Sequence, residues 1–189
     1  MVPLFMFLDP SPVKHFLLFF ALVFALTSTA QQLFPTIECE TLADRRLAIP
    51  KDLKGKRSVI CLAMSPKAER LLRVWNHPLY NALIADGMGG LMGGKMYNAQ
   101  LCFVGMLKGI AKIGLNEAKN KSKKEIDKTL YSNFMVSEDS VSDLTKLLGI
   151  RTTSEPHFFI LDDKGIIIYQ TQGAYSEEKM NALTDKLLE

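Results

Sequence analysis

Three cysteines could carry thiol chemistry in this chain: Cys39, Cys61 and Cys102. The reactive species would be the thiolate, which needs a polar or electropositive setting. Cys61 and Cys102 lie within apolar runs, which predicts small buried side chains. Cys39 stands between Glu38 and Glu40, which predicts a half-exposed strand and leaves the burial of Cys39 itself open. Because the three are widely spaced and form no C-x-x-C pair, we expect no disulfide framework.

Other nucleophiles and bases are few. Ser65 begins a predicted helix, and no His or Asp is placed by the sequence to activate its hydroxyl, so we expect a helix cap. His77 precedes Pro78, which favours a hydrogen-bonding role at a break in a helix. His157 follows Pro156 at the start of a strand, and we expect a structural role there as well.

A glycine-rich stretch offers two further motifs. Residues 89–95 match the first seven positions of a phosphate-binding loop, but Met96 stands where Ser or Thr should hold magnesium. The stretch also follows a predicted helix instead of opening one. Met88, Met92 and Met96 could offer thioethers to copper(I), although the intervening glycines disfavour a regular helix that would bring them together. We therefore expect no cofactor and no metal.

The first thirty residues have the pattern of an export signal. Lys14 and His15 precede an apolar run at 16–26, and small residues follow it up to Ala30. The run has about 11 residues, against roughly 20 for a membrane-spanning helix. We expect a signal peptide at 1–30, cleavage after Ala30, and a single mature domain at 31–189 in the periplasm or outside the cell. Membrane contact is expected only through this segment, and its retention as an anchor stays open.

The charge of the chain does not favour nucleic-acid binding. The net charge is +3 and the pI is near 8.7. The one dense basic run, 119–124, continues into Glu125 and Asp127, which predicts a solvated helix face rather than a nucleic-acid surface.

The elements that must position these residues alternate between strands and helices. A hairpin is predicted within 36–49, buried strands at 58–64 and 99–107, and a short strand at 133–136. Helices are predicted from Ser65 to a break near Pro78, then at 79–85, 110–130 and 140–148. A second hairpin at 157–170 precedes a last helix capped by Ser176. This order predicts an α/β fold with a central mixed β-sheet flanked by helices.

The ending of the chain resembles the thioredoxin superfamily. Carrying the resemblance are Gly149-Ile150-Arg151, Pro156, the 157–170 hairpin and Gly173-Ala174-Tyr175-Ser176. The front half is similar to the redoxin branch in its hairpin, the segment 52–56, a buried strand and a helix. The resemblance implies a thioredoxin-like fold over about residues 36–188 and a cis-proline at Pro156.

In active members of that family a C-x-x-C pair or a single peroxidatic Cys occupies the helix start. Here that position reads Ser65-Pro66-Lys67-Ala68, with no sulfur. The resemblance also implies a ligand groove between this loop and the proline loop. We name its candidate residues as Ser65, Pro66, Lys67, Glu155, Pro156 and His157.

A narrower resemblance is to the mitochondrial ATP synthase assembly factors, which are thioredoxin-like and lack the cysteine pair. It rests on Trp75, Pro78-Leu79-Tyr80, Asp127, Tyr131, Phe134, Val136, Leu148-Gly149-Ile150, Phe159-Ile160-Leu161-Asp162 and Gly165-Ile166-Ile167. This resemblance implies architecture, and no ATP synthase role is inferred from it.

Two functions remain open. The first is a non-catalytic binding or assembly module of the cell envelope, whose groove takes a protein or peptide partner by strand addition. The second is an atypical thiol-disulfide oxidoreductase or peroxiredoxin-like enzyme that uses a lone cysteine. The absent cysteine pair favours the first and argues against an enzyme. The oligomeric state is not indicated.

Overall fold

The computed structural model describes residues 32–85, 99–107 and 112–188, and a compact unit covers Gln32–Glu189. The predicted signal segment and the glycine-rich motifs of 88–96 lie outside the described residues. Within the part that is described, no helix is long and apolar enough to span a membrane.

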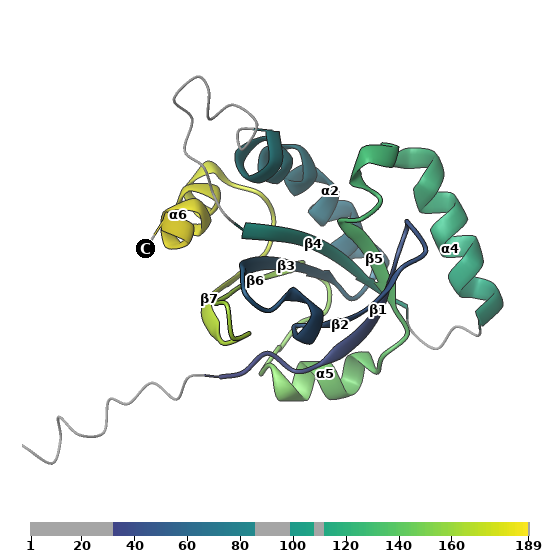
Figure 1. The fold of residues 1–189 in the computed structure, drawn as a ribbon, viewed down its shortest axis with the longest axis horizontal. Helices are drawn as coiled ribbons and strands as arrows, with labels where there is room; N and C mark the ends of the chain where they lie inside the picture. The colour runs from purple at the N-terminus through teal and green to yellow at the C-terminus, as the bar shows by residue number, and fades with distance from the viewer. Residues whose placement is uncertain (1–31, 86–98, 108–111, 189) are drawn as a thin grey trace, which may run out of the picture. The chain divides into compact units, whose positions relative to one another are not determined.

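A seven-stranded mixed sheet forms the centre of this unit, in the order β2-β1-β5-β4-β3-β6-β7 (Figure 1). Its strands are β1 (Ile37–Thr41), β2 (Arg46–Ile49), β3 (Arg57–Ala63), β4 (Ala99–Met106), β5 (Phe134–Ser137), β6 (His157–Leu161) and β7 (Ile167–Gln172). β3, β4 and β5 run parallel, whereas β1 and β6 pair antiparallel with β5 and β3. The predicted α/β class, the mixed sheet and both hairpins are confirmed.

Helices α2 (Pro66–Tyr80) and α6 (Glu177–Leu188) cover one face of the sheet. Alternate residues of the strands point to this face, because side chains of a strand alternate between its two sides. Trp75 is fully buried there, and its ring packs against Phe158 and Tyr175. Trp75 is thus a core residue, as predicted.

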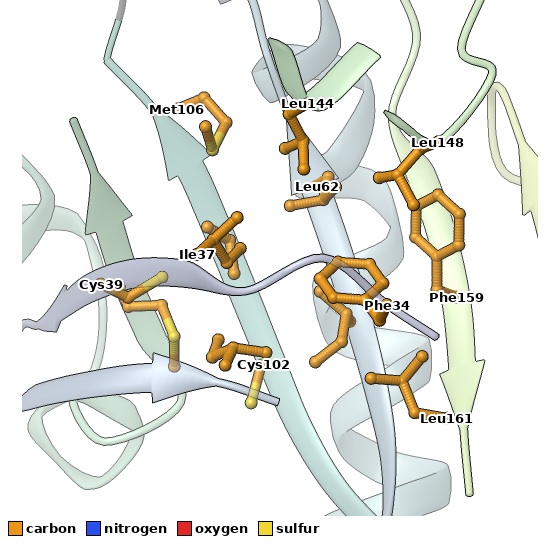
Figure 2. Packing of buried hydrophobic residues seen from close by; sticks show 14 of the residues in the cluster. Phe34, Ile37, Cys39, Leu62, Cys102, Met106, Leu144, Leu148, Phe159 and Leu161 are labelled. Carbon is orange, nitrogen blue, oxygen red and sulfur yellow. The ribbon is translucent and has the colours of Figure 1, made fainter. Parts of the chain in front are cut away.

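The opposite face is covered by α5 (Val141–Leu147) and by the segment that leads into β1. Figure 2 shows this layer, in which Phe34 meets Phe159 edge-on with ring centroids 5.4 Å apart. Cys39 and Cys102 belong to the same cluster. The prediction of a half-exposed strand around Cys39 is confirmed, because Glu38 is exposed and Glu40 partly exposed, whereas Cys39 itself is only 4% exposed. Its strand is covered on the face that carries Cys39.

Three predicted caps form as expected. The hydroxyls of Ser65, Ser140 and Ser176 each accept a hydrogen bond from the amide three residues later, at 3.2–3.3 Å. These bonds satisfy amides that a helix start leaves without partners. They fix where α2, α5 and α6 begin.

Pro78 does not end its helix. α2 continues to Tyr80, and a π-helical segment, η2 (Asn81–Ala85), follows directly. Proline denies a partner to the carbonyl of Val74, and Val74 is 58% exposed, where water can take the missing bond. His77 hydrogen-bonds here as predicted, because the side-chain nitrogen Nδ2 of Asn81 donates to its Nδ1 at 3.2 Å.

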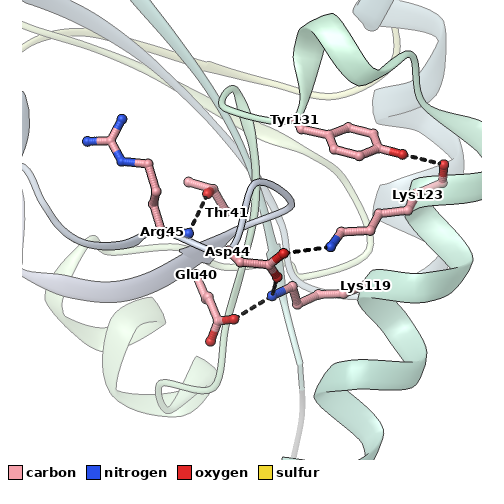
Figure 3. Close-up of polar contacts among 7 residues, drawn as sticks. All are labelled: Glu40, Thr41, Asp44, Arg45, Lys119, Lys123 and Tyr131. Atoms are coloured by element: carbon pink, nitrogen blue, oxygen red, sulfur yellow. Dashed lines mark hydrogen bonds and ion pairs between the residues drawn. The ribbon is translucent and has the colours of Figure 1, made fainter.

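Helix α4 (Lys112–Glu125) ends before the predicted residue 130, and a 3-10 turn, η4 (Lys128–Leu130), follows it. It is fastened to the turn between β1 and β2 (Figure 3). Lys119 is buried and donates to Glu40 and to Asp44, while Lys123 donates to Asp44 at 3.0 Å. The basic run is therefore not wholly a solvated face. Two of its lysines, Lys119 and Lys123, hold the helix against the turn.

Candidate functional site

The site expected from the sequence begins at the N-terminus of α2. The Ser65 hydroxyl accepts from the amide of Ala68 and donates to the carbonyl of Thr153 at 2.7 Å. One oxygen therefore caps the helix and joins the helix start to the 152–156 loop. A hydroxyl held by two such bonds has its proton committed to a carbonyl, and no base accepts it.

Around this junction the predicted residues differ in accessibility. Pro66 and Lys67 are exposed, Ser65 and Glu155 are half-buried, and Pro156 is buried. We call Pro66, Lys67 and Glu155 the loop surface, since these three offer groups to a partner.

Glu155 turns toward Gly173. A Cβ built on Gly173 would lie 3.4 Å from Glu155 Oε2 and 2.9 Å from Lys179 Nζ. Gly173 also has a φ of +103°, which side chains rarely adopt. Its amide donates to the carbonyl of Pro156 at 2.9 Å, so the turn after β7 is hydrogen-bonded to the 152–156 loop.

The expected cis-proline at Pro156 is not present. Among the described residues the one cis peptide bond is Ile49–Pro50, at the end of β2. The 152–156 loop takes its shape from other contacts, including the bond from Ser65 and a hydrogen bond from the Ser154 amide to Thr152 Oγ1 at 3.2 Å. The expectation came from the family pattern, and these hydrogen bonds hold the loop with Pro156 in the trans form.

His157 has the structural role that was predicted. It is 4% exposed, and its Nε2 lies 2.7 Å from the carbonyl of Thr152. A carbonyl only accepts, so Nε2 carries a proton and donates it. His157 also lines a cavity of about 230 Å³ with Leu148 and Gln172, beside the end of α5. It is therefore not part of the loop surface.

None of the three thiols stands at the first position of α2, which Ser65 caps. All are free and buried, and Cys61 is inaccessible in the middle of β3. Burial raises the pKa of all three: that of Cys102 to about 12, and those of Cys61 and Cys39 well above their usual value. Each therefore remains a neutral thiol at neutral pH.

The structure also contains a cavity that the sequence reasoning missed. It has a volume of about 460 Å³ and is lined by residues of α2 and α4 and of the strands β3, β4 and β5. We call it the α2–α4 cavity. Two small residues that are neighbours in the β3–β4 register, Ala63 and Gly105, lie in its lining. A glycine inside a buried strand was the signal available in the sequence, because such a glycine often marks a close approach or a ligand.

The comparisons with known proteins rest on structure. No family model matches the sequence, and no curated protein matches it. The exposed lipoprotein thioredoxin Etrx1 from Streptococcus pneumoniae superposes with a TM-score of 0.52 at 18% identity, over 82% of this chain and 98% of that one. StoA from Bacillus subtilis gives 0.51 at 19% identity, over 80% and 98%. The fold is thioredoxin-like.

The same architecture occurs in a thiol peroxidase from Chromobacterium violaceum, with a TM-score of 0.51 and 12% identity over 84% of this chain and 85% of that one. Thioredoxin-fold neighbours thus include proteins named for thiol chemistry. At such identities the likeness establishes the fold, and function must be argued from the site.

Proposed function

We propose that this protein is an exported, non-catalytic thioredoxin-fold module that binds an extended segment of a protein partner at the loop surface. The observation that carries the proposal is the state of Ser65. Its hydroxyl stands where the fold would place a reactive sulfur, and both of its hydrogen bonds serve structure. Support for export comes from residues 1–30 of the sequence.

Strand addition is the binding mode that fits the loop. The carbonyl of Thr153, the amide of Ser154 and the carbonyl of Pro156 each have an internal partner. The peptide groups of Glu155 have none within the described residues, and its side chain is half-buried. An extended peptide can pair with such groups through its own main chain.

The alternative function is a thiol enzyme, and one of the structurally similar proteins is named a thiol peroxidase. It would need one of three thiols that are buried and protonated. A test of insulin disulfide reduction separates the two functions. We expect no activity above background. Activity that Cys61→Ala or Cys102→Ala abolishes in a folded protein would overturn the proposal.

Binding is tested by site-specific photo-crosslinking in cells that produce the full chain. A photoreactive phenylalanine replaces Lys67, and a matched control carries it at the exposed Lys164 in the β6–β7 turn. We expect a defined crosslinked product from position 67 only. Glu155→Pro removes the amide donor at that position and should reduce the product at least fivefold. A product of equal yield from both positions, or one unchanged by Glu155→Pro, counts against the loop surface.

A further inference from the structure

The sheet ends in two edge strands, β2 and β7, and the chain protects them unequally (Figure 1). An edge presents main-chain N–H and C=O groups that can pair with another strand, so natural proteins block edges with charges, proline or covering segments. At β2, the amide of Ala48 donates to Asp52 Oδ2 at 2.7 Å. Arg46 adds an exposed charge, and Pro50 directly follows the strand. The β2 edge is therefore closed to a further strand.

On β7, the direction of each peptide group follows from the pairing with β6. The Gly173 amide donates to the Pro156 carbonyl, in line with the β6–β7 register. In an antiparallel pair, residues that bond the neighbouring strand alternate with residues that face away from it. The peptide groups of Gln170 and Gln172 therefore face away from β6. Lys179 agrees with this direction, because its ammonium donates to the Gln172 carbonyl at 2.9 Å.

Two features limit the open part of this edge to residues 168–172. At one end, the edge is covered by the segment that leads into β1, because the Ile167 amide donates to the carbonyl of Gln32 at 2.8 Å. At the other end, the chain leaves the strand at Gly173, whose φ is +103°. Within the described part of the chain, no hydrogen bond from outside the sheet reaches the main chain of Gln170. We call residues 168–172 the open edge of β7.

The open edge carries no charge and no proline, and its sequence is Ile168-Tyr169-Gln170-Thr171-Gln172. Its even-numbered side chains are exposed, and that of Ile168 is 42% exposed. A glutamine amide both donates and accepts hydrogen bonds, so a glutamine can pair with a copy of itself. The open edge is therefore complementary to itself, and no like charges meet when two copies approach.

We propose that two copies of this chain associate through the open edge of β7, with the strands antiparallel about a two-fold axis at Gln170. The N–H and C=O groups of the two Gln170 residues then bond each other, as in a hydrogen-bonded antiparallel pair. Ile168 of one copy lies opposite Gln172 of the other. The same surface serves both copies, which is the usual arrangement in a symmetric dimer.

A second copy fits the limits of the open edge better than a long peptide. In this register, Gly173 of one copy comes opposite Ile167 of the other, where Gln32 already covers the edge. The strand of a second copy ends at that point, whereas a longer extended peptide would have to displace Gln32. Because only five residues pair on each side, we expect a reversible dimer and not an obligate one. The proposal does not depend on peptide binding, since no residue of the loop surface lies in the open edge.

The test exchanges charges at Gln170. Gln170→Lys and Gln170→Glu each place like charges opposite one another across the axis, which destabilises a strand pair. Sedimentation velocity of the full chain, in a series up to ~100 µM, should show a concentration-dependent dimer for the wild type. Each variant alone should dimerise at least tenfold more weakly. An equimolar mixture of the two should recover dimer to within threefold of the wild type, because opposite charges then meet.

Two more variants keep the test decisive. Gln170→Pro removes the outward N–H, which an edge strand tolerates, and should also weaken the dimer at least tenfold. Arg46→Glu changes the charge at the β2 edge and should dimerise as the wild type does. All variants should keep the far-UV circular dichroism of the wild type.

Three results would overturn the proposal. The first is a wild type that stays monomeric throughout the series, since the open edge then takes another chain segment or none. The second is folded Gln170 variants that associate as strongly as the wild type, which would place the interface elsewhere. The third is a mixture of the two charged variants that stays monomeric, which would exclude a two-fold axis at Gln170.

Discussion

At the scale of single residues, the site differs from an active thiol site by the position of its sulfurs. The amides at the start of α2 would stabilise a thiolate, and Ser65 presents them with a hydroxyl instead. The three cysteines lie in the core, where burial keeps them protonated. The fold thus provides the position for a reactive thiol, but the side chain at that position is a serine.

Ser65→Cys should give the protein one fast thiol. The helix N-terminus lowers the pKa of a cysteine at this position below its usual value near 8.5. With DTNB at pH 7, we expect one equivalent to react at least tenfold faster than any thiol of the wild type. The three native thiols should react only on denaturation. A wild-type thiol that reacts as fast in the native protein would contradict the account of Ser65.

At the scale of elements, the attachment of α4 is the least conventional feature. Lys119 reaches into the protein with 4% of its side chain exposed, and both of its partners are on or beside the β1–β2 turn. The pKa of the Asp44 carboxyl is lowered below its ordinary value of 3.8. The hydrogen bond from Lys119 is the largest cause, and the hydrogen bond from Lys123 is the second. Burial opposes the charge of Lys119, but its bonds to Asp44 and Glu40 outweigh this and raise its pKa.

Lys119→Met should loosen α4. Removing the Lys119 ion pairs should lower the free energy of unfolding by on the order of 1–2 kcal/mol. This is less than the full value of a buried pair, because the Glu40 and Asp44 side chains are partly hydrated. Urea unfolding measures the stability, and hydrogen exchange of α4 amides locates the effect. Lys123→Met is the matched control and should cost less than half as much.

The same variant should change the response to acid. Because the pKa of Asp44 is lowered in the folded state, its contribution is present above the ordinary pKa of 3.8 and is lost progressively as the pH falls from there through the lowered pKa. Lys119→Met should therefore lose less stability than the wild type between pH 5 and pH 3. An identical decline in both proteins would exclude this ion pair as the cause.

Local patterns identified most elements of this fold, and the failures have definite causes. Ser65, Ser140 and Ser176 could be identified as caps because a cap depends on neighbours three residues away. The role of Lys119 could not, since its partners lie 75 and 79 residues earlier. The same holds for the α2–α4 cavity, which needs two helices and three strands. Pro156 was misjudged because a family pattern carried over an isomer that this chain does not adopt.

At the scale of the whole described unit, one sheet joins two apolar layers. Cys61 faces the α2 and α6 side, whereas Cys102, on the neighbouring strand, faces the α5 side. Neither layer can open without disturbing strands that the other shares. We expect the two layers to unfold together.

Two single-cysteine variants test this cooperativity, one that keeps Cys61 and one that keeps Cys102, with alanine at the other two positions. Pulse labelling across a urea series should expose each thiol at the midpoint that far-UV circular dichroism gives for the same variant. The two curves coincide if unfolding is a single transition. A thiol that becomes exposed at least 1 M urea earlier than the loss of secondary structure would reveal a separate unit.

The hydrogen bond from the Trp75 indole to the carbonyl of Gly173, at 3.2 Å, has a practical consequence. The Gly173 amide donates in turn to the carbonyl of Pro156. Two successive hydrogen bonds therefore connect the only tryptophan of the chain to the 152–156 loop. Because the indole is fully buried, we expect its emission to change only when a bound peptide shifts that loop and the hydrogen bonds behind it. A partner could be sought by following a wavelength shift, with no dye attached.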